Sequence, residues 1–454
     1  MTQTDLRNKR VTVVGLGNSG YNAANLLIDI GADVRVTDSA KSDATISYAE
    51  RLESRGATVE YGKHTEDFVK KSDLVILSPG VEDSSLPVRW ASRYNVPIIG
   101  EMELGYRYCK GKIIAITGTN GKSTVTTLMG DILKCGGRHA IVCGNIGNSL
   151  CGEIPRISED SWVVLEVSSF QLEHIEYFKP HIALILNITD DHMDRYKTFR
   201  EYFAAKENVF KNQLPDDYLV LNYDAENLRP LKNSARSKVF FYSRISPTDG
   251  AYLEGQDIIC ESSGMPAKVL SLSDISLKGV HNTENVTACV LASTLAGVRP
   301  DRIKEAVRNF RGLHHRVEPV EVIDGIQYID DSKGTTVDST KRALESFEKG
   351  VILIAGGKDK NSDYTVVRDA VRERVKHLVL IGEAKARIRE ALGGVVETHD
   401  ARDMEEAVII AHGLARSGMV VLLSPMCSSF DMFRDYKHRG DVFKEAVSAL
   451  KRRA

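Results

Sequence analysis

A glycine-rich stretch, GTNGKST at residues 118–124, has the clearest capacity for chemistry. It follows the apolar run KIIAIT and precedes a helical segment that begins at Lys122. The backbone amides of such a loop cradle phosphates, its lysine reaches the terminal phosphates, and the hydroxyl group after the lysine meets Mg²⁺. Ile116 stands where the full Walker A motif has its first glycine, so this loop is shorter than in GTPases. The pattern predicts a site for a nucleoside triphosphate.

A second loop, GLGNSG from Gly15 to Gly20, fits the G-x-G-x-x-G pattern. It follows a strand, opens a helix and precedes Asp38, which ends the next strand about 20 residues on. The glycines permit a tight turn and let backbone amides approach a diphosphate. Asp38 would accept hydrogen bonds from a hydroxyl group or a base edge. The literal interpretation is an NAD-dependent dehydrogenase, but UDP fits such a loop as well as NAD does, and the glycines could also serve only to pack a strand against a helix.

Carboxylates and a histidine follow two further apolar strands. Glu166 ends WVVLE, and the residues Asp190, Asp191 and His192 follow IALILNIT. In an open α/β sheet, the carboxyl ends of the strands line the ligand crevice. A carboxylate at a strand end is usually a cap or a surface group, but beside a phosphate loop we predict that Glu166 binds Mg²⁺. His192 is predicted to contact the metal or the phosphates.

Lys206 lies in the helical stretch YFAAKENVF, with Phe203 at i−3 and Phe210 at i+4. Lysines on helices are usually solvated, but these apolar neighbours predict that Lys206 faces inward. A buried ammonium needs a partner or a changed charge.

Three strand ends in the last third of the chain carry lysines and hydroxyl groups. The segments are DDSKGTT at 330–336, GGKDK at 356–360 and SPMCSSF at 424–430. Each is a weak signal alone, because loops favour such residues. Together they predict a binding site for a carboxylate or a phosphate.

Short apolar runs alternate with helical segments throughout, which predicts parallel, doubly wound sheets of the α/β class. The chain has 454 residues, more than one core holds, and we expect three domains. The expected domains are 1–100, which is Rossmann-like, 101–312, which is P-loop ATPase-like, and 313–454, which is again Rossmann-like. Residues 245–275 look rich in β structure.

Composition excludes several classes of protein. Sixty basic and 62 acidic residues give a formal net charge of −2, unlike the basic surface of a nucleic-acid binder. The seven cysteines are odd in number and form no CxxC pair, which argues against a disulfide framework or a zinc site. The first residues lack the apolar stretch of a signal peptide, and the apolar runs are far shorter than the roughly 20 residues that span a bilayer. We expect a cytoplasmic monomer without nucleic-acid partners or membrane insertion.

These motifs resemble those of the Mur ligases of peptidoglycan synthesis, over essentially the whole chain. GTNGKST, EVSSFQL, NITDDHMDR and AAKENVF are similar to the central-domain motifs in order, and HNTENV and LHHR to the nucleoside contacts. DDSKGTT, GGKDK and SPMCSSFDMFRDYKHRG, with VVGLGNSG and LSPGV, are most similar to the members that add D-glutamate to UDP-N-acetylmuramoyl-L-alanine.

The resemblance implies roles for the matching residues. ATP would contact Gly118, Thr119, Asn120, Gly121, Lys122, Ser123, Thr124, Asn282, Asn285, Arg316, Asp331 and Lys333. The UDP-linked substrate would contact Ser19, Asp38, Ser39, Gly80, Asn145 and Gln171. D-Glutamate would contact Thr335, Lys360, Ser429 and Tyr436, although Lys358, Asp359 and Lys360 could exchange roles. Two Mg²⁺ ions, replaceable by Mn²⁺, would be arranged by Ser123, Glu166, His192 and a carbamylated Lys206. The implied catalytic residues are Lys122, Glu166, His192 and Lys206.

The implied reaction is an ATP-dependent ligation in two steps. The substrate carboxylate attacks the γ-phosphate and gives an acyl phosphate and ADP. The amine then attacks the carbonyl carbon and, through a tetrahedral intermediate, expels phosphate. A dehydrogenase leaves the GTNGKST loop unexplained, and a nucleotide switch leaves the carboxylate site of the third domain unexplained. Another Mur ligase or a folylpolyglutamate synthase is the nearest alternative, although the UDP-type first domain and DSKGT disfavour the latter. Ala40 stands where related enzymes can carry an arginine near uracil, so the uridine contacts stay open.

Overall fold

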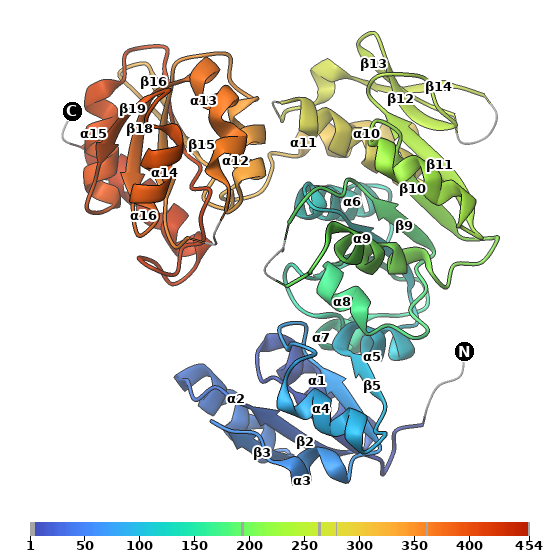
Figure 1. The fold of residues 1–454 in the computed structure, drawn as a ribbon. Coiled ribbons are helices and arrows are strands. Elements are labelled where there is room, and N and C mark those ends of the chain that lie inside the picture. Colours follow the sequence, from blue (N-terminus) through green and yellow to red (C-terminus); the bar gives the residue numbers. More distant parts are fainter. Residues whose placement is uncertain (1–4, 192–194, 262–264, 278, 360–361, 453–454) are drawn as a thin grey trace. The chain divides into compact units, whose positions relative to one another are not determined.

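The computed structural model describes residues 5–191, 195–261, 265–277, 279–359 and 362–452, which contain three sheets with helices packed against them (Figure 1). The chain forms two compact units. The first comprises the residues up to Ile275 together with Glu284–Phe310, and the second comprises Ser276–Thr283 and the residues from Arg311 onward. The predicted α/β class with three sheet-containing parts is confirmed.

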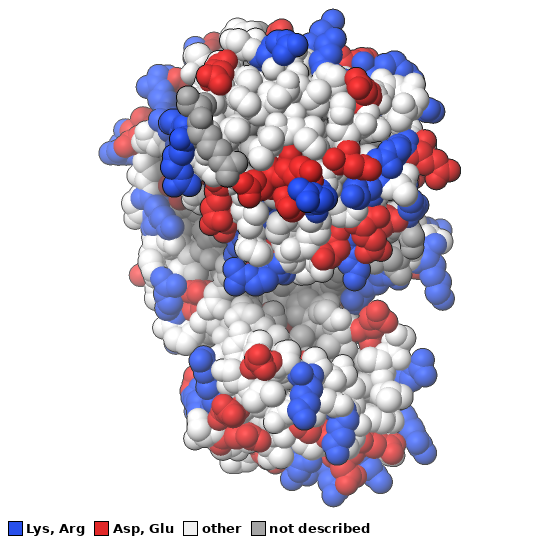
Figure 2. Space-filling model, turned by 90° about the vertical axis from the view of Figure 1, so that its left-hand side faces the viewer, with Lys and Arg blue, Asp and Glu red and all other residues white. Residues whose placement is uncertain are grey.

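Charged side chains of both signs are interspersed on the face that Figure 2 shows, in keeping with the nearly balanced composition. Among the helices of the described residues, none combines the length and the apolar character needed to cross a bilayer.

The first sheet is parallel, in the order β3-β2-β1-β4-β5. Its central strands are buried on both faces, which is why they consist of continuous apolar runs. The strands are β1 (Arg10–Val14), β2 (Asp33–Asp38), β3 (Thr58–Tyr61), β4 (Leu74–Leu77) and β5 (Ile98–Gly100). The helices are α1 (Asn18–Ile30), α2 (Asp43–Glu53), α3 (Glu66–Lys70), α4 (Leu86–Arg93) and α5 (Glu101–Tyr108). The sheet reverses its strand order between β1 and β4, the point at which open α/β sheets bind ligands.

The second sheet has the order β14-β13-β12-β11-β10-β9-β6-β8-β7. From β7 to β12, neighbouring strands in this order are parallel to one another. At the other end of the sheet, β13 is antiparallel to both β12 and β14, within the stretch predicted to be rich in β structure. The strands are β6 (Lys112–Thr117), β7 (Ala140–Gly144), β8 (Trp162–Glu166), β9 (Ile182–Ile185), β10 (Tyr218–Asn222), β11 (Lys238–Ser243), β12 (Gly250–Glu254), β13 (Asp257–Cys260) and β14 (Ala267–Ser271). The α-helices are α6 (Lys122–Cys135), α7 (Leu150–Glu153), α8 (Ser169–Glu173), α9 (Phe199–Glu207), α10 (Val280–Leu295) and α11 (Pro300–Asn309). Short 3₁₀ helices cover Ile154–Arg156, Asn208–Phe210, Glu226–Asn233 and Leu272–Asp274.

The third sheet has the order β15-β16-β20-β17-β18-β19, and only β15 is antiparallel to its neighbour. Two apolar clusters cover its two faces. The strands are β15 (Glu318–Ile323), β16 (Ile326–Asp330), β17 (Val351–Gly356), β18 (Val375–Ile381), β19 (Glu397–Asp400) and β20 (Val420–Leu423). The helices are α12 (Val337–Leu344), α13 (Arg368–Arg374), α14 (Lys385–Leu392), α15 (Met404–Leu414), α16 (Tyr436–Lys451) and the 3₁₀ helix Tyr364–Val367.

Candidate functional site

The glycine-rich loop 118–121 joins β6 to α6, and β6 lies between β8 and β9. Gly118 (φ +151°) and Gly121 (φ +86°) adopt backbone conformations that favour glycine. A Cβ on Gly121 would also lie 2.5 Å from Asn285 Oδ1, so the side chain of Asn285 packs directly against the loop. Lys122 Nζ donates to the carbonyl oxygens of Gly118 and Thr119, each at 2.8 Å. The side chain of Lys122 therefore folds back over the loop, beside the predicted position of the phosphates.

The loop is also held from β9. Asn120 N donates to Asn187 Oδ1 at 2.8 Å, and Thr119 N donates to the carbonyl oxygen of Asn187 at 2.8 Å. The hydroxyl of Thr119 lies 3.1 Å from that of Tyr202. Ser123 and Thr124 are buried in the first turn of α6. Contacts from the segment after β9 and from α9 thus fix the loop.

Lys206 is 2% exposed at the end of α9, which confirms that it faces inward. Its Nζ donates to the carbonyl oxygen of Gly118 at 2.9 Å and lies 4.7 Å from the centre of the Tyr202 ring. Burial, followed by the nearby charge of Lys122, lowers the pKa of Lys206 well below its usual range. Asp191 and Glu166 act in the opposite direction, because their negative charges favour the ammonium.

Glu166 is 1% exposed at the end of β8, beside the end of β6. Asn145 Nδ2 donates to Glu166 Oε1 at 2.8 Å. The other carboxylate oxygen, Oε2, is buried and has no hydrogen-bond partner among the described residues. Such an orphan oxygen is costly unless a ligand or ion completes its coordination. The predicted metal ligand His192 lies outside the described residues.

The glycines in the loop from Gly15 to Gly20 are of two kinds, those at which a Cβ would clash with neighbouring atoms and one at which it would not. A Cβ on Gly15 would lie 2.9 Å from Ser78 Cβ, and one on Gly20 would lie 1.8 Å from the carbonyl oxygen of Gly15, so packing alone excludes larger residues there. A Cβ on Gly17, at the N-cap of α1, would meet nothing within 4 Å. Asp38 accepts hydrogen bonds from the backbone amides of Leu16 and Ala40. Asp38 therefore shapes the loop itself, a role that the sequence analysis does not include.

The other residues predicted for the UDP-linked substrate lie in the same unit. Ser19 is half-buried in the first turn of α1, and Ser39 and Gly80 are exposed after β2 and β4. Open space faces Gly80. Gln171 is buried, and its Oε1 accepts from Ser168 N at 2.9 Å in the capping box of α8.

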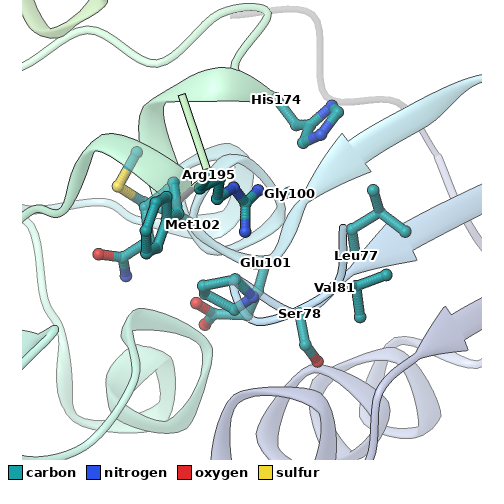
Figure 3. Close-up of a pocket in the computed structure, with 11 residues that line it drawn as sticks. Leu77, Ser78, Val81, Gly100, Glu101, Met102, His174 and Arg195 are labelled. Atoms are coloured by element: carbon teal, nitrogen blue, oxygen red, sulfur yellow. The ribbon is translucent and has the colours of Figure 1, made fainter. Parts of the chain in front are cut away.

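A recess lies between the loop after β4 and helix α8 (Figure 3). Figure 3 shows Ser78 and Glu101 on one side of it and His174 and Arg195 on the other. Glu101 is 1% exposed, and its Oε1 accepts from Cys151 N at 2.8 Å, whereas its Oε2 has no partner among the described residues. Burial raises the pKa of the Glu101 carboxyl group. Sequence reasoning missed Glu101, although its place directly after β5 is the kind of strand end that signalled Glu166.

The three loops predicted to converge in the third domain follow neighbouring strands, β16, β20 and β17. The buried guanidinium of Arg439 joins two of them. It donates to Ser332 Oγ at 3.0 Å, Ser332 O at 2.8 Å, Cys427 O at 3.1 Å and Ser428 O at 3.2 Å. Burial lowers the pKa of Arg439 to about 10. Sequence reasoning missed this residue, because its type alone suggests a solvated helix.

The residues predicted for D-glutamate lie on or beside these loops: Thr335 follows β16, Ser429 follows β20 and is buried, and Tyr436 begins α16. The Lys333 ammonium lies 5.5 Å from the centre of the Tyr436 ring. Asp359 accepts from the Tyr364 hydroxyl at 2.9 Å and is paired with Arg387. Lys360 lies outside the described residues.

Asp331 is 4% exposed and accepts from Ser424 Oγ at 2.7 Å. Burial raises the pKa of Asp331 to about 7, although that hydrogen bond and the charge of Arg316 act against the shift. Arg316 Nε is buried without a partner among the described residues. The residues predicted for ATP are divided between the units, with Asn285 and the phosphate loop in the first and Asn282, Arg316, Asp331 and Lys333 in the second.

Three protein-family models match successive parts of the chain. Residues 9–100 match the Mur ligase MurD-like N-terminal domain, 116–293 match the Mur ligase middle domain, and 315–427 match the Mur ligase, glutamate ligase domain. The chain belongs to the Mur ligase family. It is therefore an ATP-dependent ligase that forms carbon–nitrogen bonds in the synthesis of peptidoglycan precursors.

Relatives of this Mur ligase include proteins named UDP-N-acetylmuramoylalanine--D-glutamate ligase. The protein from Koribacter versatilis is 45% identical over 448 residues, and that from Geotalea daltonii is 43% identical over 447; each match covers 98% of both chains. The crystal structure of the Thermotoga maritima UDP-N-acetylmuramate-alanine ligase MurC has a TM-score of 0.62 at 20% identity, covering 98% of this chain and 100% of that one. The T. maritima MurF ligase in complex with ADP has a TM-score of 0.61 at 14% identity, covering 100% and 97%. These structures share the fold of this Mur ligase.

Proposed function

We propose that this Mur ligase joins D-glutamate to UDP-N-acetylmuramoyl-L-alanine in the cytoplasm, with ATP as the energy source. The observation that carries the proposal is identity of 43–45% over 98% of the chain to relatives named for that reaction. The geometry supports it, because one chain contains a diphosphate-type loop, a phosphate loop beside the orphan carboxylate oxygen of Glu166, and a cluster of loops predicted to bind a carboxylate. We propose residues 1–100, 101–312 and 313–454 as the domains that carry these three sites.

The proposed path of the UDP-linked substrate runs from the glycine loop after β1 to Glu166. The segment after β7 lies along this path, since Asn22 on α1 donates to Asn148 Oδ1 at 2.6 Å and Asn145 donates to Glu166. The UDP group would lie against the amides near Gly17, where no side chain intrudes. Ser19, Asp38, Ser39, Gly80 and Gln171 would complete its surroundings.

The residues around Lys206 fit a Mg²⁺ site. Glu166 Oε2 offers a buried oxygen without a protein partner, and the hydroxyl of Ser123 lies in the first turn after the phosphate loop. We assign Ser123, Glu166, His192 and a carbamylated Lys206 to hold the metal, with two ions in total. When bound, Mg²⁺ supplies positive charge that offsets the charge of the phosphates.

Carbamylation of Lys206 follows from its surroundings. A buried ammonium beside Lys122 is unfavourable, and the neutral amine is a nucleophile. Its nitrogen lone pair would attack the carbon of CO₂, one proton would leave the nitrogen, and the product would be a carbamate anion. That anion presents oxygen ligands to Mg²⁺ where an ammonium would repel the ion.

The reaction would begin when the L-alanine carboxylate attacks the γ-phosphorus, which breaks the bond to the β-γ bridging oxygen and releases ADP. Lys122 neutralises phosphate charge during this step. The acyl phosphate then has a good leaving group, unlike the free carboxylate. The amine of D-glutamate attacks the carbonyl carbon, the tetrahedral intermediate expels phosphate, and the amine loses a proton. His192 would orient the amine or the acyl phosphate.

The acceptor would bind at the loops after β16, β20 and β17. Thr335, Lys360, Ser429 and Tyr436 would contact D-glutamate, and Arg439 fixes the backbone that carries Ser429. Asn282, Asn285, Arg316, Asp331 and Lys333 would contact the nucleotide.

The test is ADP release with UDP-N-acetylmuramoyl-L-alanine and a panel of amino acids, namely D-glutamate, L-glutamate, L-alanine and D-alanine. D-Glutamate alone should support turnover. Turnover with another amino acid but not with D-glutamate would assign the chain to a different step. For Lys206, intact-protein and peptide mass spectra in CO₂-saturated buffer should show the mass of one added CO₂, and Lys206→Ala should lose both the added mass and activity. An active enzyme with unmodified Lys206 would refute the carbamate.

A further inference from the structure

Two histidines and a glutamate lie together on the edge strand β19 and its neighbour β18 in the third sheet. The edge strand β19 pairs only with β18 in the described part of the chain, and Glu397 stands opposite His377 in that pairing. His399 follows Glu397 by two residues, so its side chain projects from the same face of the sheet. The side chains of His377 and His399 are 25% and 24% exposed, and an ion from solvent could reach them.

The distances match the ligand spacing of one metal ion. His399 Nε2 lies 3.2 Å from His377 Nδ1, Glu397 Oε2 lies 3.4 Å from His377 Nδ1, and Glu397 Oε1 lies 3.7 Å from His399 Nε2. One ligand atom from each of the three residues can be chosen so that all lie within 4.8 Å of one another. Zinc bonds of about 2.0–2.1 Å in tetrahedral geometry separate neighbouring ligand atoms by roughly 3.3 Å. The three groups therefore need little movement to bind one ion.

We propose that His377, Glu397 and His399 bind one divalent metal ion of the kind that prefers imidazole ligands, with Zn²⁺ as the expected ion. Two imidazoles and a carboxylate favour Zn²⁺, Co²⁺ or Ni²⁺ over Mg²⁺, so this site differs in chemistry from the Mg²⁺ site at the phosphate loop. Three protein ligands leave the fourth position for water. The spacing of the cysteines argues against a cysteine-based zinc site but carries no information about imidazoles that two paired strands bring together.

The bound ion would join the edge strand to its neighbour. β19 is only four residues long, and its outer edge has no partner strand among the described residues. A cation held by His377 on β18 and by two residues of β19 would link the strands through their side chains. We therefore assign the ion a structural role, which stabilises the second unit without taking part in the ligation.

The test uses the full-length protein after treatment with a chelator, in excess Mg²⁺ and at neutral pH. Zn²⁺ affinity and stoichiometry are measured by titration calorimetry, and Co²⁺ serves as a spectroscopic probe because its tetrahedral complexes absorb visible light strongly. The wild type is compared with His377→Ala, His399→Ala and Glu397→Gln. His412→Gln is the matched control, because this histidine of the same unit contacts Tyr328 and Asp324 instead.

The wild type should bind one Zn²⁺ that excess Mg²⁺ does not displace. Each variant should weaken this binding by at least ~10-fold and lose the tetrahedral Co²⁺ spectrum, whereas His412→Gln should keep both. Zn²⁺ should raise the Tm of the wild type but not of the variants. Equal Zn²⁺ affinity and Tm shift in the wild type and the variants would overturn the proposal, as would the absence of Zn²⁺ binding by the wild type. Glu397→Gln alters an exposed side chain, so it remains informative if a histidine variant folds poorly. None of these readouts depends on the ligase reaction.

Discussion

Replacing Arg439 with methionine should destabilise the second unit strongly. The guanidinium is fully buried and donates four hydrogen bonds, three of them to backbone carbonyl oxygens. Methionine fills part of the space but leaves those acceptors buried without donors, at a cost of about 1 kcal/mol or more each. With three carbonyl oxygens and one hydroxyl left without their donor, we expect a total loss of about 3–4 kcal/mol for Arg439→Met.

Urea unfolding followed by circular dichroism measures this change in the free energy of unfolding. Arg434→Met is the control, since Arg434 belongs to the same segment but is exposed, and it should stay within about 0.5 kcal/mol of the wild type. Arg439→Lys keeps a charge but cannot reproduce the planar fork, so it should fold with intermediate stability. Because the loops that carry Ser332 and Ser429 would loosen, Arg439→Lys should also raise the KM for D-glutamate more than the KM for ATP. A stability of Arg439→Met within 1 kcal/mol of the wild type would refute this account of the loops.

Three further predictions concern the glycine loop, the phosphate loop and Asp331. Gly17→Ala should fold like the wild type, because its Cβ meets only open space, but it should raise the KM for the UDP-linked substrate, because that space is where the diphosphate would approach the amide. Gly20→Ala should lower the Tm, because its Cβ would lie 1.8 Å from the Gly15 carbonyl oxygen. Normal kinetics for Gly17→Ala would show that the diphosphate does not approach this amide. Lys122→Ala should reduce turnover by roughly 100-fold or more while the circular dichroism spectrum is unchanged, and near-normal turnover would remove the phosphate loop from the mechanism. The Asp331 carboxyl group has a pKa of about 7 in the fold, above its unfolded value, so its contribution to stability is complete below pH 4 and is lost as pH rises towards 7. Asp331→Asn cannot ionise and should remove from the stability profile a loss on the order of 4 kcal/mol, and unchanged pH dependence in this variant would contradict the assignment.

The strand ends that carry chemistry were predictable because the central strands of parallel sheets are buried on both faces. Their continuous apolar runs reveal where each strand stops, and Glu166 and the phosphate loop stand at those points. Strand order was not predictable, since it depends on which distant runs pair. The order β16-β20-β17 nevertheless brings the three suspected loops to neighbouring strands, as their shared chemistry suggested.

The inward orientation of Lys206 was predicted correctly from its apolar neighbours Phe203 and Phe210. α9 ends at Glu207, and Phe210 lies in the 3₁₀ helix that follows directly, buried in the same apolar cluster as Tyr202 and Ala205. Phe203 is only half-buried, and the face that packs inward is marked by Tyr202 and Ala205.

The burial of Arg439 could not have been found from local patterns, whereas Glu101 carried a strand-end signal but not the identity of its partner. Burial of a charged side chain is decided by partners that are distant in sequence, such as Ser332 for Arg439 and Cys151 for Glu101. The same limit applies to His377 and His399, which become neighbours only through the pairing of β18 with β19. Residue type and spacing carry no trace of such pairings.

Oxygen followed from the substrate carboxylate into the products reveals whether ligation passes through an acyl phosphate. UDP-N-acetylmuramoyl-L-alanine labelled with ¹⁸O in both carboxylate oxygens is incubated with ATP, D-glutamate and the enzyme, and the products are weighed by mass spectrometry. We expect a product extended by one D-glutamate that keeps one ¹⁸O, together with phosphate that carries the other. A failure to form the extended product, or its formation with phosphate free of ¹⁸O, would contradict the account.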